Sequence, residues 1–184
     1  HLGDTKSGGA PCTDAVLDEQ LQFLGRFGSP TLYTPGDNEW TDCHQAKSGR
    51  YDPRERLAYI RRHYFPRPGT SFGSHSLDLT HQGVAGYPEN ARTLIDEVMF
   101  VTVHVVGTNN NLRRETPAAV EEFHARDAAN RTWLPSSFAH AKHAGARAIV
   151  IGLHANMFND AFTPRSESWV EGCLLYTSDA ADEE

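Results

Sequence analysis

The sequence predicts an α/β fold, because β-prone runs alternate with segments that have helical periodicity. Residues 98–106 are almost continuously apolar and β-branched, and residues 148–153 form a second apolar run. Such runs are typical of strands that are covered on both faces. A shorter β-prone run, residues 31–33, leads into a Pro-Gly turn, and residues 2–3 are interpreted as part of another strand. Strands that alternate with helices favour a sheet with parallel pairing.

The first helix is expected to begin after Thr13, whose hydroxyl can accept a hydrogen bond from the first helical turn. Leu17, Leu21 and Leu24 recur at positions i, i+4 and i+7, so they share one face, which is expected to pack on the sheet. Gly25 ends this pattern. The helix links the first two β-prone runs, and such a crossover between parallel strands is nearly always right-handed.

A second helix has a well-defined start. Asp52 is the expected N-cap, Pro53 takes the first helical position, and Glu55 is placed to reach back to the cap. Pro66 ends the helix. Its apolar stripe is formed by Leu57, Ile60 and Tyr64. Its arginines are expected on the solvated face: Arg54, Arg56, Arg61 and Arg62.

The remaining segments have less distinct patterns. Residues 67–91 are rich in Gly, Ser, Pro and His, so a loop with at most one short strand is expected. His104 is interpreted as a hydrogen-bonded core residue, and residues 107–111 as a polar loop that brings three amides to the strand ends. Residues 118–144 are expected to be helical, with a break or kink at Pro135. Core contacts are expected from Trp133, Leu134, Phe138 and Ala141.

Polar side chains follow three of the predicted strands. Asp4 follows the first, Asp37 and Asn38 follow the turn after the second, and His154 follows the last. Ligands of open α/β sheets bind at the carboxyl ends of the strands, so these side chains are expected to converge. Carboxylate oxygens and an imidazole nitrogen suit a hard or borderline divalent metal ion.

The order Gly-Asp, then Gly-Asp-Asn-Glu, then His resembles the calcineurin-like metallophosphoesterase superfamily. The resemblance implies a partial sandwich of mixed β-sheet layers flanked by helices, and two divalent metal ions of the Fe, Zn or Mn class. It makes Asp4 the carboxylate that bridges the metals, and Asp37 and His154 further metal ligands. Asn38 stands where the family has a catalytic His. The implied function is hydrolysis of a small-molecule or protein phosphoester by a metal-activated water.

The family's Asp-x-His and Gly-His-x-His motifs do not occur in this chain. We therefore expect residues 1–172 to be a partial domain that lacks an N-terminal and a C-terminal strand and is inactive by itself. Residues 173–183 resemble translated sequencing-adapter sequence, which makes residues 173–184 a non-native tail. An ordinary acidic tail is the alternative. Four of the 24 acidic residues lie in this tail, so most of the acidic excess comes from it.

The composition excludes some functions and bears on the compartment. The net charge of -7 argues against nucleic-acid binding, which needs a basic surface. The apolar runs are too short for a membrane span. Outside the tail there are two cysteines, Cys12 and Cys43. A disulfide between them would imply an oxidising compartment, and so an extracytoplasmic or secreted protein; two buried thiols in a cytosolic protein are the alternative.

Two other functional readings stay open. A non-catalytic member of the same fold, acting as a binding or cell-surface module, is favoured by Asn38, because an amide does not release a proton at neutral pH. The second alternative is a metal-free α/β protein whose acidic loops are only turns. Metal binding separates the hydrolase from both.

Overall fold

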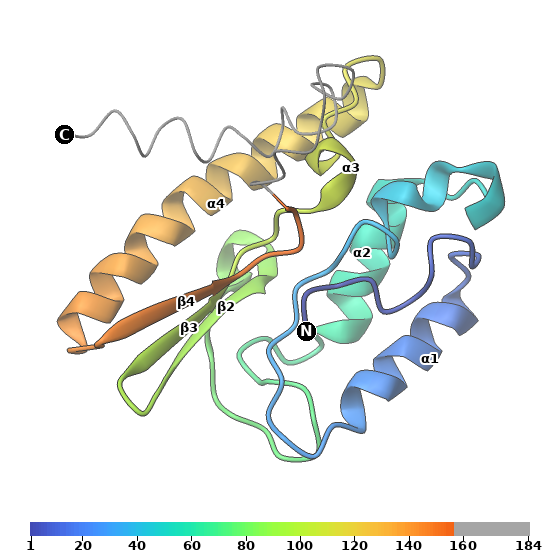
Figure 1. Ribbon diagram of the computed structural model, residues 1–184. Helices are drawn as coiled ribbons and strands as arrows, with labels where there is room; N and C mark the ends of the chain where they lie inside the picture. Colours follow the sequence, from blue (N-terminus) through green and yellow to red (C-terminus); the bar gives the residue numbers. More distant parts are fainter. Residues whose placement is uncertain (157–184) are drawn as a thin grey trace.

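The computed structural model describes residues 1–156 of the chain, and the expected boundary near residue 172 and the tail lie outside them. Figure 1 shows the long helix α4 (Pro117–His143) alongside a sheet, while α1 (Asp14–Gly25) and α2 (Pro53–Tyr64) lie together in the other half of the molecule. The α/β class predicted from the sequence is confirmed. None of the helices in residues 1–156 is both long enough and apolar enough to cross a membrane.

The sheet contains four strands in the order β1-β2-β3-β4. These are β1 (Thr80–Gln82), β2 (Tyr87–Ile95), β3 (Val98–Thr102) and β4 (Ala148–Gly152). The first three pair antiparallel, and β4 pairs parallel with β3 after the α4 crossover. The sheet is therefore mixed, and its parallel pair is formed by the two runs that are most apolar in the sequence.

The expectation of a loop over residues 67–91 is wrong, because β1 and half of β2 lie there. The β2 strand escaped notice because Glu89 and Asn90 face inward and are fully buried. Their charge and polarity are satisfied inside: Glu89 pairs with Arg61 of α2, and Asn90 donates to Asn130 of α4. A strand with a polar buried face does not show the alternating pattern from which strands are predicted.

The strands expected at residues 2–3 and 31–33 are not members of the sheet. The two segments nevertheless lie side by side: the His1 amino group donates to the Leu32 carbonyl at 2.8 Å, and Thr34 N donates to the His1 carbonyl at 3.2 Å. Thr31 forms an isolated bridge with Phe72. The α1 helix therefore connects two neighbouring extended segments, as expected, but outside the four-stranded sheet.

Helix α1 begins at the predicted cap, where Thr13 Oγ1 accepts a hydrogen bond from Val16 N at 3.3 Å. Leu17 and Leu24 are fully buried. They pack in a cluster with α2 and the residue 33–40 segment instead of on the sheet. The cluster contains Tyr33, Trp40, Leu57, Tyr59, Ile60, Tyr64 and Val106.

Helix α2 has the expected N-cap, because Asp52 accepts from Arg54 N at 2.9 Å. Glu55 pairs with the Arg56 guanidinium, so the predicted reach back to the cap is wrong. Arg56 is also not solvated: it is 4% exposed and donates to the Cys12 carbonyl at 3.0 Å. Arg61 pairs with Glu89 of β2, so two of the four arginines connect α2 to other segments of the chain.

Helix α4 continues through Pro135, so the expected break is not found. The hydroxyls of Ser136 and Ser137 donate to the Trp133 carbonyl inside the same turn. Trp133 is buried against β3 residues, and Phe138 is 48% exposed, which corrects its expected place in the core. As expected, the helix ends before Gly145, whose φ of 69° is costly for residues with a Cβ.

Candidate metal centre

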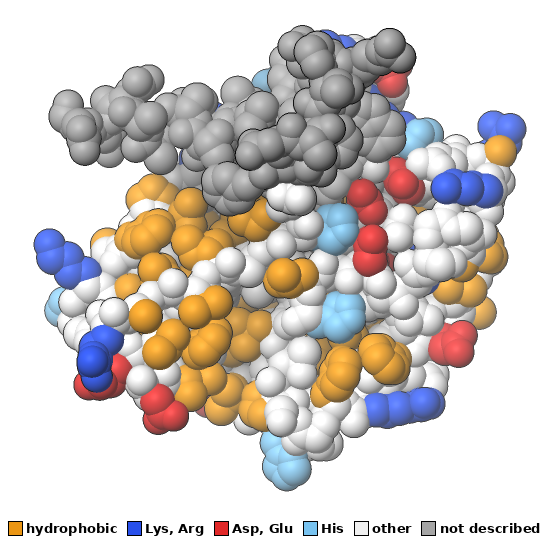
Figure 2. Space-filling model, viewed as in Figure 1, with side chains coloured by type: hydrophobic (Ala, Val, Ile, Leu, Met, Phe, Trp, Pro, Cys, Tyr) orange, Lys and Arg blue, Asp and Glu red, His pale blue; other side chains and the backbone are white. Residues whose placement is uncertain are grey.

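Three sequence-predicted ligands come together at the junction of the two halves. Asp4, Asp37 and His154 each offer a ligand atom, and these atoms lie within 4.8 Å of one another. Asp4 follows the N-terminal segment, Asp37 follows the Pro35-Gly36 turn, and His154 follows β4. Figure 2 shows acidic side chains and histidine gathered near the middle of one face of the molecule.

The approach of the first two loops requires glycine. Gly3 has a φ of 74°, and a Cβ at this position would lie 2.1 Å from Gly36 N. No side chain fits at that distance, so the backbones of the two loops are in direct contact. This contact places Asp4 immediately against the segment that carries Asp37.

The three side chains are held by hydrogen bonds. His154 Nε2 lies 3.3 Å from Asp4 Oδ1, and the same oxygen accepts from Asn38 N at 3.3 Å. Thr108 Oγ1 donates to Asp37 Oδ2 at 3.1 Å. Gly107 N donates to His154 Nδ1 at 3.0 Å, so in the neutral ring the proton is on Nε2, facing Asp4.

The electrostatics of the cluster favour a bound cation. Burial, together with the nearby Asp4 and Asp42 carboxylates, raises the pKa of Asp37 to about 6 against the lowering effects of His154 and Thr108. Burial alone would lower the pKa of His154, but the hydrogen bond that it donates to Asp4 and the charges of Asp37 and Asp4 together outweigh it and raise the pKa. In Asp4 burial favours a raised pKa, but the hydrogen bond and charge of His154 and the hydrogen bond from Asn38 N together outweigh it, so the pKa is lowered. Two carboxylates this close repel each other when both are ionised. A proton or a metal ion bound between them relieves this repulsion.

Asn38 lies at the edge of this cluster. Its backbone amide contacts Asp4, but its side-chain amide donates to the Lys6 carbonyl at 3.4 Å. The Lys6 ammonium is 5% exposed and donates to the Ala10 carbonyl at 2.9 Å. The Asn38 side chain is therefore used to hold the loop that follows Asp4.

The Cys12–Cys43 disulfide is present in the structure, with 5.7 Å between the Cα atoms. Both residues are fully buried. The bond connects the loop after Asp4 to the segment after Asp37, so it closes the same pair of loops that the two carboxylates occupy.

Glu39 was missed as a site residue. It is fully buried, and its Oε1 accepts from Thr5 N at 2.6 Å and from Thr5 Oγ1 at 2.9 Å. This pair of bonds ties the residue after Asp4 to the Asp37 loop. The signal was present in the sequence, since Glu39 belongs to the Gly-Asp-Asn-Glu motif.

Of the three asparagines expected near the site, two form hydrogen bonds with helix α4. Asn110 and Asn111 are buried and bond to Arg126 and Glu122 of α4. Thr108, which carried no prediction, supplies the contact to Asp37. The side-chain directions could not be read from the composition of the loop.

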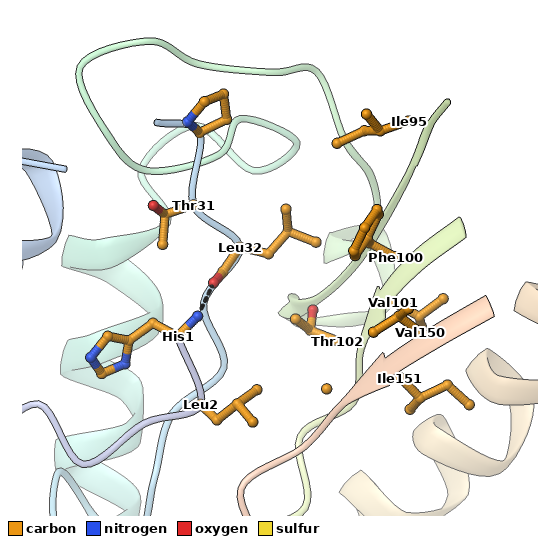
Figure 3. A pocket seen from close by; sticks show the side chains of 12 residues that line it. His1, Leu2, Thr31, Leu32, Ile95, Phe100, Val101, Thr102, Val150 and Ile151 are labelled. Atoms are coloured by element: carbon orange, nitrogen blue, oxygen red, sulfur yellow. Dashed lines mark hydrogen bonds between the residues drawn. The ribbon is translucent and has the colours of Figure 1, made fainter. Parts of the chain in front are cut away.

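An apolar groove lies beside the metal-ligand cluster and has a volume of about 570 Å³. Figure 3 shows Leu2 and Leu32 on one side, and Phe100 and Val150 on the other. Leu2 is 49% exposed and Val150 is 48% exposed. The groove separates the N-terminal segment from the sheet along part of their length.

Comparisons with protein-family models, curated proteins and solved structures find no match to this chain.

Proposed function

We propose that this chain carries the ligand-bearing part of a metal-dependent phosphoric-ester hydrolase of the calcineurin-like metallophosphoesterase type. The observation that carries the proposal is the convergence of Asp4, Asp37 and His154, which are 33 and 117 residues apart in sequence, within 4.8 Å. The motif order in the sequence supports the finer assignment to this fold.

The donor set fits a divalent ion of the Mn, Fe or Zn class. Two carboxylates and one imidazole are ligands that such ions take, and the carboxylates supply the negative charge that retains the ion. When bound, a pair of divalent ions in such a site lowers the pKa of a bound water and neutralises phosphoryl oxygens. Asp4 has two oxygens, so it can contact two ions.

The chain's own residues define access and polarity. The Asp4 side chain is 41% exposed and that of His154 is 15% exposed, so the cluster opens to solvent on the Asp4 side. A phosphoester can therefore reach it. The Asn38 amide, which bonds to the Lys6 carbonyl, cannot supply a proton, so hydrolysis should favour substrates with good leaving groups.

A non-catalytic binding module is the second candidate. The observation that favours it is the Asn38 side chain, which bonds to the Lys6 carbonyl. In a module of this kind no metal ion would be held tightly and no ester would be cleaved.

Calorimetric titration with Mn²⁺ tests the proposal. We expect weak binding by the chain and loss of binding in Asp4→Asn. The control is Asp96→Asn, which should leave binding unchanged. Asp96 is an exposed carboxylate in the β2–β3 turn, and its φ of 47° is close to the φ of 53° at Asp4. Hydrolysis of p-nitrophenyl phosphate is measured in parallel in a chain extended by its neighbouring gene sequence. In that longer chain, tight Mn²⁺ binding together with hydrolysis supports the hydrolase, whereas neither binding nor hydrolysis favours the module. Equal binding by Asp4→Asn and the unchanged chain contradicts the metal centre.

A further inference from the structure

The chain makes an unusual turn directly after the extended residues 103–106. Thr108, Asn109, Asn110 and Asn111 have φ values of 50°, 53°, 51° and 66°. Four consecutive residues with a Cβ in the left-handed region are sterically unfavourable. Such a conformation persists only where surrounding contacts determine it, and it often occurs at functional sites.

Helix α4 supplies those contacts. Asn110 is fully buried, and its Oδ1 accepts from Arg126 Nη1 at 2.6 Å and from Val106 N at 3.1 Å. Arg126 Nη2 donates to the Asn110 carbonyl at 2.9 Å. Asn111 Nδ2 donates to Glu122 Oε2 at 2.8 Å. The turn is thus bound to two residues one helical turn apart on α4.

Arg126 is itself fixed. It is fully buried, bonds to the Glu122 carboxylate at 2.6 Å, and donates to the His104 carbonyl at 2.9 Å. Its guanidinium also lies 5.2 Å from the centre of the Trp40 ring. A guanidinium with this many fixed partners has one orientation, so it transmits the position of α4 to the turn.

The first two residues of the turn face the metal-ligand cluster. Gly107 N donates to His154 Nδ1, and Thr108 Oγ1 donates to Asp37 Oδ2. A Cβ at Gly107 would lie 2.3 Å from Asp37 Oδ2, so the turn approaches the carboxylate too closely for a side chain. Asp37 and His154 come from separate loops, and this turn contacts both.

We propose that the left-handed turn positions Asp37 for a metal ion, and that the Thr108 hydroxyl is the positioning group for the Asp37 carboxylate. The metal-binding consequence rests on the proposed function; the positioning of the Asp37 carboxylate does not. Thr108 is a positioning residue and not a ligand. Groups of this kind fix the orientation of metal ligands, and their loss typically reduces affinity 10- to 100-fold.

Thr108→Val and Thr108→Ser test the role of the hydroxyl. Valine keeps the branched shape and removes the hydroxyl, whereas serine keeps the hydroxyl. We expect Thr108→Val to weaken Mn²⁺ binding roughly tenfold, and Thr108→Ser to retain the affinity of the unchanged chain within about twofold. Thr108→Ala replaces Thr108→Val if the valine variant does not fold, as judged by circular dichroism.

The carboxyl ¹³C resonance of Asp37 in the metal-free protein provides a second readout. It should move in Thr108→Val and stay in Thr108→Ser. If the unchanged chain binds no Mn²⁺, the proposed function fails, and this resonance alone decides the positioning of Asp37. Equal resonances and affinities in all three proteins overturn the role of Thr108. Equal losses in the valine and serine variants overturn it as well. A resonance that moves in Thr108→Val with unchanged Mn²⁺ affinity overturns the metal-binding consequence and supports the positioning of the Asp37 carboxylate.

Discussion

At the scale of single residues, the two carboxylates of the cluster have different surroundings. Asp4 accepts from Asn38 N and contacts His154, and its pKa is lowered. Asp37 is more buried, its pKa is raised to about 6 mainly by that burial, and its carboxylate accepts a hydrogen bond from the Thr108 hydroxyl. The charge at Asp4 is therefore stabilised by the protein, whereas that at Asp37 is partly opposed.

Asp37→Asn should be mild where Asp4→Asn is severe. The change removes a carboxylate whose ionisation burial already opposes, and its amide oxygen can still ligate a metal ion and accept from Thr108. We expect Mn²⁺ affinity to fall less than tenfold in Asp37→Asn, while binding is lost in Asp4→Asn, measured by calorimetry at pH 7.5. Equal, severe losses in both variants would show that Asp37 is more than a substitute for an amide ligand.

The sequence predicted the site better than the hydrogen bonds that hold it. Asp4, Asp37 and His154 come together as predicted because two paired extended segments and β4 end beside one another, although the two segments lie outside the sheet. Thr108 and Glu39 were not, because their roles depend on side-chain directions across loops that are distant in sequence. The left-handed geometry of residues 108–111 is also invisible in the sequence, since it is maintained by Arg126, 16 residues beyond Asn110.

At the scale of elements, capping and periodicity predicted the helices, whereas β2 was missed. The caps Thr13 and Asp52 are local, so two or three neighbouring residues determine them. The β2 strand instead buries Glu89 and Asn90, whose partners lie on α2, on α4 and at His104, after the end of β3. A strand stabilised by a buried polar network is recognised only after the other elements are in place.

This buried network should make the fold sensitive to acid. Burial lowers the pKa of His104 to about 4, although Glu89 opposes this, and Arg61 and Arg126 are the nearby cations. Because the folded pKa lies below the unfolded value, the unfolded state binds a proton first as the pH falls. Stability is therefore lost between about pH 6.5 and pH 4. The pKa of Glu89 is also lowered, by Arg61 and His104 against the effect of burial, which adds a loss at lower pH.

Urea unfolding at pH 7, 5.5 and 4.5 measures this loss. The difference between the unfolded and folded pKa of His104 corresponds to a loss of roughly 3 kcal/mol in the free energy of unfolding. His104→Gln should unfold at a lower urea concentration at pH 7, but its free energy of unfolding should decrease less as the pH falls. His63→Gln, on the exposed face of α2, is the matched control. A pH dependence that is unchanged in His104→Gln would rule out this residue as the source.

At the scale of the whole molecule, the candidate metal centre lies where the two halves meet. Asp4 and Asp37 belong to the half with α1 and α2, and His154 belongs to the half with the sheet and α4 (Figure 1). On one side of this junction the apolar groove separates the halves. The contacts around the cluster therefore contribute to how the halves are held, in addition to any ligand role.

The Cys12–Cys43 disulfide should stabilise the half that carries both carboxylates. It joins residues separated by 31 positions, and constraining a loop of this length in the unfolded chain contributes about 3 to 4 kcal/mol in the chain-entropy model. The double variant Cys12→Ser/Cys43→Ser should unfold at a lower urea concentration, with a free energy of unfolding that is smaller by this amount. The oxidised protein treated with a reductant under unfolding conditions should refold with the same lower stability.

Thiol labelling decides whether the bond forms in an oxidising compartment, which is the basis for proposing an extracytoplasmic or secreted protein. The chain is produced in such a compartment with Cys173→Ser, so that Cys12 and Cys43 are the remaining cysteines. After unfolding without a reductant, we expect no reactive thiol, because both sulfurs are in the disulfide. The matched control is the same protein reduced before labelling, which should show two. Two reactive thiols in the unreduced protein would contradict the bond, and with it the argument for secretion.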